Sequence, residues 1–110
     1  MPHKPFDRYL IAYCTCPADV APEIARVLVR KRVAACVNVI PGLLSVYEWK
    51  GAIEEDAESL LVIKTREDRF RALEATIREV HPYETFELVA ADVKMGSRAY
   101  LDWIDSVLGE

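Results

Sequence analysis

Glycine is scarce in this chain of 110 residues, which contains only four, well separated from one another. A glycine-rich loop of the kind that cradles phosphates therefore has no counterpart here. The sequence also lacks a pair of CxxC motifs and any Ser-His-Asp arrangement. These absences exclude the usual sequence signatures of nucleotide-binding proteins, structural zinc domains and serine hydrolases.

Basic residues are outnumbered, because 14 Lys and Arg stand against 18 Asp and Glu and give a net charge of −4 at pH 7. Without a basic block, the chain is not expected to bind nucleic acid or an anionic membrane. No apolar run reaches the roughly 18 residues of a membrane span, and residues 1–8 lack the apolar core of a secretory signal. Three cysteines, an odd number, favour free thiols. We therefore expect a cytoplasmic protein without a membrane partner.

Hydrophobic residues make up 52% of the chain and charged residues 29%, which suits a single domain over residues 1–110 with a flexible tail at 1–8. Apolar runs rich in branched and aromatic side chains predict strands, and apolar residues at three- and four-residue spacing predict helices. The predicted elements are a strand at 9–15, a helix capped by Asp19, an extended stretch at 34–50 broken at Pro41-Gly42, a returning strand ending at Thr65, a helix at 68–80 capped by Asp68, a strand at 86–94 and a helix capped by Ser97 that ends at Leu108.

This order of elements contains two strand–helix–strand halves. It predicts an α+β fold, a ferredoxin-like split βαβ sandwich with a long central β-hairpin and an extra C-terminal helix. The hairpin is long for so small a domain, and it carries Tyr47 and Trp49 on one face. Because exposed apolar strand edges pair with other chains, we expect a homo-oligomer assembled through the hairpin strands. The alternative is that the C-terminal helix covers this face within one subunit.

Cysteines are the first candidates for chemistry. Cys14 and Cys16 end the first strand, and alternation along a strand places both thiols on the same side. Two close thiolates suit soft metal ions such as Cu(I). Alternatively, one of the two is a core side chain and the other a surface thiol. Cys36 lies between apolar residues of a strand and is expected in the core.

His81 is the second candidate. It ends a helix, precedes a proline, and is followed by Tyr83, Glu84 and Glu87. An imidazole beside carboxylates can bind a divalent cation or act in acid–base chemistry. The alternative is a histidine that caps the C-terminus of a helix, with the nearby acids merely solvated.

Several short motifs along the chain match one known family. They are CVNVIPG at 36–42, YEWKG at 47–51, IKT at 63–65, HPYE at 81–84 and YLDW at 100–103. In order and spacing they resemble the CutA (CutA1) family of divalent-cation tolerance proteins, from about residue 9 to residue 108. The resemblance implies a ferredoxin-like subunit that assembles as a homotrimer through its hairpin strands, similar in architecture to the PII signalling trimers. It also implies a part in the response to metal ions such as copper.

The resemblance further implies a metal site. The family's cysteine at the end of the first strand falls on Cys14, its histidine in the HPY segment on His81, and its following glutamate on Glu87. Cys16 adds a thiol that many relatives lack. Phe86 stands where the family usually has proline, which predicts a less rigid loop.

Three functions are compatible with these residues. The first is a non-enzymatic trimer that binds metal ions, copper among them, and requires no other cofactor. The second is a PII-like signalling trimer that binds a small molecule in a cleft between subunits. The expected cleft residues are Tyr47, Trp49, Lys64, Tyr83 and Glu84. The third is an enzyme that uses His81 and Glu84 as acid and base, which we do not favour because no activated nucleophile is visible.

Overall fold

The computed structural model describes residues 8–109. Its elements follow the predicted order, and the predicted fold is confirmed. The elements are β1 (Tyr9–Cys16), α1 (Ala21–Arg30), β2 (Cys36–Trp49), β3 (Ala52–Arg66), a 3-10 turn (Glu67–Arg69), α2 (Phe70–Val80), β4 (Leu88–Asp92) and α3 (Arg98–Leu108). Positions 1–7 of the predicted tail lie outside the described residues, whereas Arg8 forms ion pairs with Glu67 and Asp92.

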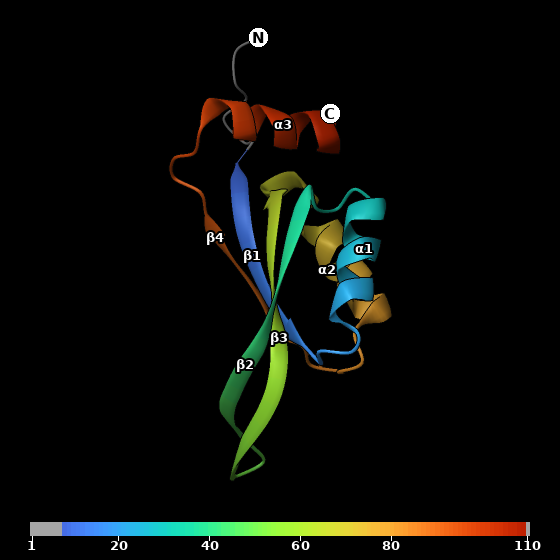
Figure 1. Cartoon of the computed structure of the whole chain (residues 1–110), viewed down its shortest axis with the longest axis vertical. Coiled ribbons are helices and arrows are strands. Elements are labelled where there is room, and N and C mark those ends of the chain that lie inside the picture. Colours follow the sequence, from blue (N-terminus) through green and yellow to red (C-terminus); the bar gives the residue numbers. More distant parts are fainter. Residues whose placement is uncertain (1–7, 110) are drawn as a thin grey trace.

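The four strands form one antiparallel sheet in the order β2-β3-β1-β4. Helices α1 and α2 cover one face of this sheet, and α3 crosses its end, far from the hairpin tip (Figure 1). The main core lies between the sheet and these two helices, and a second cluster lies beneath α3. Among residues 8–109, no helix has the length and apolar character needed to cross a membrane.

The β2–β3 hairpin extends well beyond the rest of the sheet. Its strands have 14 and 15 residues and are joined by Lys50-Gly51. Both turn residues have positive φ, 52° and 85°, as a type I′ turn requires. Strand β1 pairs with β3 only as far as Cys16 opposite Ser59. Residues 52–58 of β3 therefore pair with β2 alone, and the subunit measures 52 Å by 25 Å by 23 Å (Figure 1).

A β-bulge interrupts the hairpin where the sequence predicted a break. Ile40 pairs with Leu60 and Leu43 with Glu58, so β2 contains one residue more than β3 in this interval. Gly42 has a φ of 83°, which residues with a Cβ atom rarely adopt. The extra residue shifts the alternation of β2 side chains relative to β3 from this point to the turn.

Several local predictions were wrong. A turn closed by Val20 N–H and the Pro17 carbonyl comes before α1, whose N-cap is Val20 without a side-chain cap, so Asp19 is not the cap. Asp68 lies in the 3-10 turn rather than at the N-cap of α2, because its carboxylate binds Arg66. Strand β4 is shorter than predicted. The predicted cap at Ser97 is confirmed.

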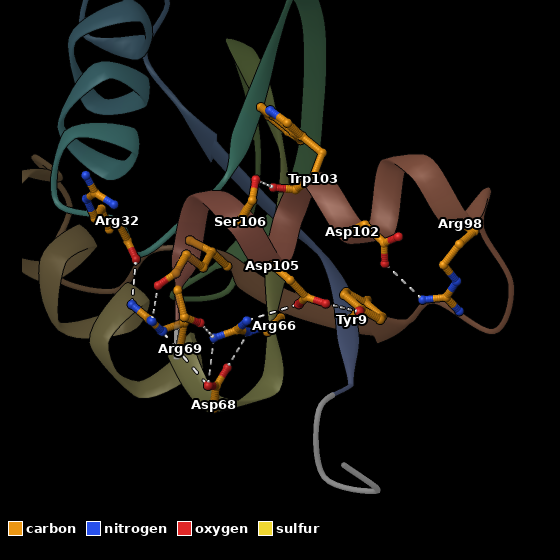
Figure 2. Close-up of polar contacts among 12 residues, drawn as sticks. Tyr9, Arg32, Arg66, Asp68, Arg69, Arg98, Asp102, Trp103, Asp105 and Ser106 are labelled. Carbon is orange, nitrogen blue, oxygen red and sulfur yellow. Dashed lines mark hydrogen bonds and ion pairs between the residues drawn. The ribbon is translucent and has the colours of Figure 1, made fainter. Parts of the chain in front are cut away.

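Arg66 joins the end of β3 to α3 (Figure 2). Only 4% of this residue is exposed. Its Nε and Nη2 donate to Asp68, both at 3.0 Å, and its Nη1 donates to Asp105 at 3.0 Å. Nη2 also donates to the Gly109 carbonyl at 2.7 Å, while the Tyr9 hydroxyl donates to Asp105 at 2.6 Å. The guanidinium therefore fixes α3 against the sheet.

Two further arginines donate to carbonyl groups at the C-terminus of α3. Arg32 donates to the Val107 carbonyl at 3.1 Å. Arg69, drawn beside the end of α3 in Figure 2, donates to the Leu108 carbonyl. The last carbonyls of a helix have no partner within the helix and carry partial negative charge. Positive side chains at this end therefore stabilise α3 in its position.

Replacing Arg66 by Met removes the main hydrogen-bond donor to the Asp68 carboxylate and one of the donors to the Asp105 carboxylate. The buried guanidinium donates four hydrogen bonds, whereas the carboxylates that it leaves are 34% and 38% exposed and regain some water. We therefore expect the free energy of unfolding to fall by about 2 kcal/mol, measured by urea denaturation. Arg26→Met is the matched control, since it removes only an exposed pair with Glu23 and should cost less than about 1 kcal/mol. Equal losses in the two variants would contradict the role given to Arg66.

Candidate functional site

A pocket of about 760 Å³ lies where β1 ends and the hairpin continues without it. Its walls come from the end of β1, the outer parts of β2 and β3, and the segment between α2 and β4. The lining residues are Thr15, Ser45, Val46, Tyr47, Trp49, Asp56, Glu58, Tyr83, Glu84, Thr85 and Glu87. The early end of β1 thus makes room for the pocket.

Strand alternation separates the thiols from this pocket. Cys14 pairs with Leu61 in the core, and both Cys14 and Cys16 are fully buried in the cluster beneath α1 and α2. Thr15, between them, points to the other face and lines the pocket. The prediction that both thiols share a side is confirmed, and the alternative of one surface thiol is wrong.

Burial also suppresses ionisation of these thiols. It raises the pKa of Cys14 to about 12 and that of Cys16 to about 11, and the negative charge of Glu58 adds to both shifts. Cys36 was expected in the core but is half-buried, because it pairs with Lys64 and so faces away from the helices. All three cysteines are free thiols.

His81 fastens the segment after α2 to the end of β1. Its Nε2 lies 2.8 Å from the Thr15 carbonyl oxygen, and its Nδ1 accepts a hydrogen bond from Tyr83 N–H at 3.1 Å. Because a carbonyl oxygen only accepts, the proton is on Nε2. The Phe86 ring stacks on the imidazole, with centroids 5.4 Å apart. His81 is 7% exposed, and both of its nitrogens are engaged within the chain.

Two tyrosine hydroxyls hold carboxylates in the pocket. Tyr47 donates to Asp56, and Tyr83 donates to Oε2 of Glu58 at 3.1 Å. The hydrogen bond to Asp56 raises the pKa of Tyr47 to about 12. Burial, followed by the hydrogen bond to Glu58, raises the pKa of Tyr83 to about 12. Both phenols therefore stay neutral donors at physiological pH.

Every charged side chain that lines the pocket is an acid. These side chains are Asp56, Glu58, Glu84 and Glu87. The Thr15 hydroxyl donates to Glu87 at 3.3 Å, and Glu58 is only 5% exposed. The pocket thus offers carboxylate and hydroxyl oxygens, which are ligands for cations.

Most of the predicted cleft residues meet here. Tyr47, Trp49, Tyr83 and Glu84 line the pocket, whereas Lys64 lies outside the lining and donates to Asn38. Asp56 and Glu58 were missed in the sequence. The sequence could have revealed them. Counting cross-strand pairs from the Lys50-Gly51 turn toward the bulge places both on the same face of the hairpin as Tyr47.

The predicted metal residues do not converge within one subunit. Cys14 faces the helices, His81 uses both ring nitrogens, and Glu87 faces the pocket. In the part of the chain that the structure describes, no group of three or more His, Cys, Asp or Glu side chains is placed to hold a metal ion. A Cys–His–Glu centre therefore does not fit the subunit as it stands.

The family model for the CutA1 divalent ion tolerance protein matches residues 10–107. The chain belongs to the CutA1 family. It is 51% identical over 100 residues to the Protein CutA homolog of Xenopus laevis, covering 90% of this chain and 66% of that protein. The structure of the divalent cation tolerance protein Cut A1 from Thermus thermophilus superposes with a TM-score of 0.89 at 42% identity, over 92% of this chain and 99% of that one.

A second solved CutA structure is described as PII-like. The PII-like protein CutA from Nostoc sp. PCC 7120 superposes with a TM-score of 0.85 at 34% identity, over 91% of this chain and 97% of that one. The chain spans between 54% and 66% of the length of the vertebrate CutA proteins that it matches. CutA proteins named as chloroplastic and as periplasmic also match, so membership of the family does not determine the compartment.

Cys14 and Cys16 of this CutA1 chain should resist alkylation in the native state. Because the thiolate is the reactive form and both thiols are buried with raised pKa values, we expect iodoacetamide to modify them on the order of 100-fold more slowly than in urea-unfolded protein. Peptide mass spectrometry measures each rate separately. Rapid alkylation of native protein at pH 7 would show that the thiols are accessible thiolates.

The same shifts set a pH dependence. In the native state the pKa of the Cys14 thiol is raised from 9.0 to about 12. This shift stabilises the native state fully below pH 9. The stabilisation is lost as pH rises from 9 toward 12, because the thiol of the unfolded chain ionises first. The urea midpoint should therefore fall above pH 9, and it should fall less steeply in Cys14→Ala. An identical slope in the two proteins would contradict the assignment of this pH dependence to Cys14.

Proposed function

We propose that this protein is a cytoplasmic homotrimer that binds divalent cations, copper included, and takes part in the response to metal ions. The observation that carries the proposal is the charge of the pocket, whose charged lining residues are all acids. Such a lining attracts cations and repels anions. Membership of the divalent ion tolerance family supports the same ligand class, and three free thiols support a reducing compartment.

The homotrimer is supported by the exposed part of the hairpin. Leu44, Val46 and Ile53 are 59%, 58% and 70% exposed in the single subunit, and Trp49 is 51% exposed. Helix α3 lies at the other end of the sheet, far from the hairpin tip (Figure 1). A two-stranded ribbon is marginally stable in water by itself. Association of copies through these strands would bury its apolar residues.

Glu87 is the member of the predicted metal set that faces the pocket, and we assign it as the first metal ligand. His81 can join only if its bond to the Thr15 carbonyl or to Tyr83 N–H breaks. Cys14 and Cys16 can become metal ligands only if the end of β1 rearranges so that their side chains face the pocket. The proposal therefore places initial binding on oxygen ligands and later binding on nitrogen and sulfur.

A second function, a PII-like module that binds a small molecule, is supported by the size and walls of the pocket. Its volume of about 760 Å³ is typical of small-molecule sites and far larger than a single ion needs. The aromatic side chains of Tyr47 and Trp49 add largely apolar walls. We propose no catalytic role, because the hydrogen bonds of His81 leave it no free nitrogen for acid–base chemistry with Glu84.

Assembly as a trimer predicts a melting temperature that rises with protein concentration and a native mass three times that of the chain. Leu44→Glu should weaken association, because it places a charge in the buried hairpin surface. Val29→Glu, at a 39% exposed position on α1, is the matched control and should leave the mass unchanged. A melting temperature that ignores dilution, with a monomeric mass, would contradict the proposal.

Metal binding through the pocket predicts that Glu87→Gln weakens the affinity for Cu²⁺ and Mn²⁺ by about tenfold, since one charged ligand is lost. Native mass spectrometry and calorimetric titration of the reduced protein measure the stoichiometry and the affinity. Glu55→Gln, which removes an exposed charge from the same hairpin, should have little effect. If Glu87→Gln binds both metals as tightly as the unmodified protein, Glu87 is not a ligand.

A further inference from the structure

His81 supplies a hydrogen-bond donor to β1 beyond the point where β4 ends. Strand β4 pairs with β1 as far as Leu88 opposite Cys14, and Thr15 lies one residue past this last pair. Thr15 is 7% exposed, and its carbonyl oxygen lies 2.8 Å from Nε2 of His81. A buried carbonyl left without a donor costs free energy. The imidazole therefore has a task within the backbone of the subunit.

The second ring nitrogen of His81 holds the segment that follows it. Nδ1 accepts a hydrogen bond from Tyr83 N–H at 3.1 Å, which requires a neutral ring with its proton on Nε2. The residues between α2 and β4, 81–87, form no helix or strand of their own. The two bonds of the imidazole therefore fix this segment to the end of β1.

The Phe86 ring packs on the imidazole and holds its orientation. The ring centroids of Phe86 and His81 lie 5.4 Å apart, and the two planes differ by 25°. The guanidinium carbon of Arg78 lies 5.1 Å from the centroid of the Phe86 ring, and Arg78 donates to Glu74 at 3.3 Å. Ring stacking and cation–π contacts add to the stability of one arrangement of these side chains. In that arrangement, both imidazole nitrogens are bonded.

From these contacts, we propose that Phe86 is a positioning residue that holds His81 in its two hydrogen bonds, so that the imidazole ties the segment after α2 to β1 and is not available to metal ions in the native state. The failure of Cys14, His81 and Glu87 to converge then has a physical cause on the side of the histidine. This role of Phe86 rests on the proposed function only in its metal part, where it confines native metal binding to oxygen ligands such as Glu87.

The rate at which the His81 Nε2 proton exchanges with water tests this role without any metal. Nitrogen-15 NMR of the full chain detects the proton at about pH 8, where free imidazole is neutral. Phe86→Leu keeps an apolar side chain but removes the stacked ring, and exchange should become about threefold to tenfold faster. Phe86→Tyr keeps the ring, and its exchange rate should stay within about twofold of that of the unmodified protein.

Phe70→Leu is the matched control. Phe70 begins α2 and, like Phe86, is a half-buried side chain that packs against the main core. Because the helix separates it from His81 by about 16 Å, its loss should lower stability and change the exchange rate by less than about twofold. Equal acceleration in Phe70→Leu and Phe86→Leu would indicate general loosening of the core and overturn the role of Phe86. An unchanged rate in Phe86→Leu, or a proton too labile to detect in the unmodified protein, would also overturn it.

Titration of the unmodified protein with Zn²⁺, a diamagnetic ion that binds imidazole readily, separates this role from the proposed function. Zn²⁺ that binds while the His81 Nε2 proton and both ring nitrogens keep their signals supports it. Zn²⁺ that displaces this proton, or shifts the signal of either ring nitrogen as a ligand would, overturns it and leaves the proposed function standing. If neither Zn²⁺ nor Cu²⁺ binds, the metal part of the proposed function is removed, and the exchange rates decide the role of Phe86.

Discussion

The difference in length between β1 and β3 is the constraint on which the rest of the subunit depends. Strand β1 has 8 residues and β3 has 15, so β3 continues past the last β1 pair with β2 as its single neighbour. The part of the hairpin beyond β1 therefore has exposed apolar side chains. At the base of this part, the pocket lies next to β3 where a longer β1 would have continued. At the other end of β3, where all its neighbours are present, the chain closes tightly around Arg66.

Alternation along β1 then divides the chemistry of the site into two layers. The thiols of Cys14 and Cys16 belong to the dry layer under the helices, and the Thr15 hydroxyl belongs to the oxygen-rich layer of the pocket. His81 lies at the boundary, because it binds the carbonyl of Thr15 and orients the backbone of Tyr83. A set of residues that looks like one centre in the sequence is therefore spread over both sides of a sheet. Because of this separation, the acids line the pocket and the thiols do not.

The order of elements was predictable from the sequence because strand and helix periodicities differ clearly, and the Pro41-Gly42 break marked the bulge. The ends of the elements were less predictable, because tertiary contacts decide them. Asp68, for example, accepts hydrogen bonds from Arg66 and does not cap α2. Tyr47 and Trp49 were found as exposed aromatics on one face. Asp56 and Glu58 were missed, because within a run of acids they look like an ordinary solvated strand. The tie between His81 and Thr15 spans 66 positions, and no local pattern reveals it.

The single extra residue of the β-bulge bears on how such a site can change during evolution. Before the bulge, Val37 and Val39 share a face with Ile63 and Leu61, so odd positions of β2 face the helices. Beyond it, odd positions share a face with Asp56 and Glu58, which brings Tyr47 and Trp49 into the pocket. Loss of one codon at the bulge would restore the original phase and present even-numbered residues instead. In this hairpin a one-residue deletion, rather than a series of substitutions, would replace both Tyr47 and Trp49 in the pocket in one step.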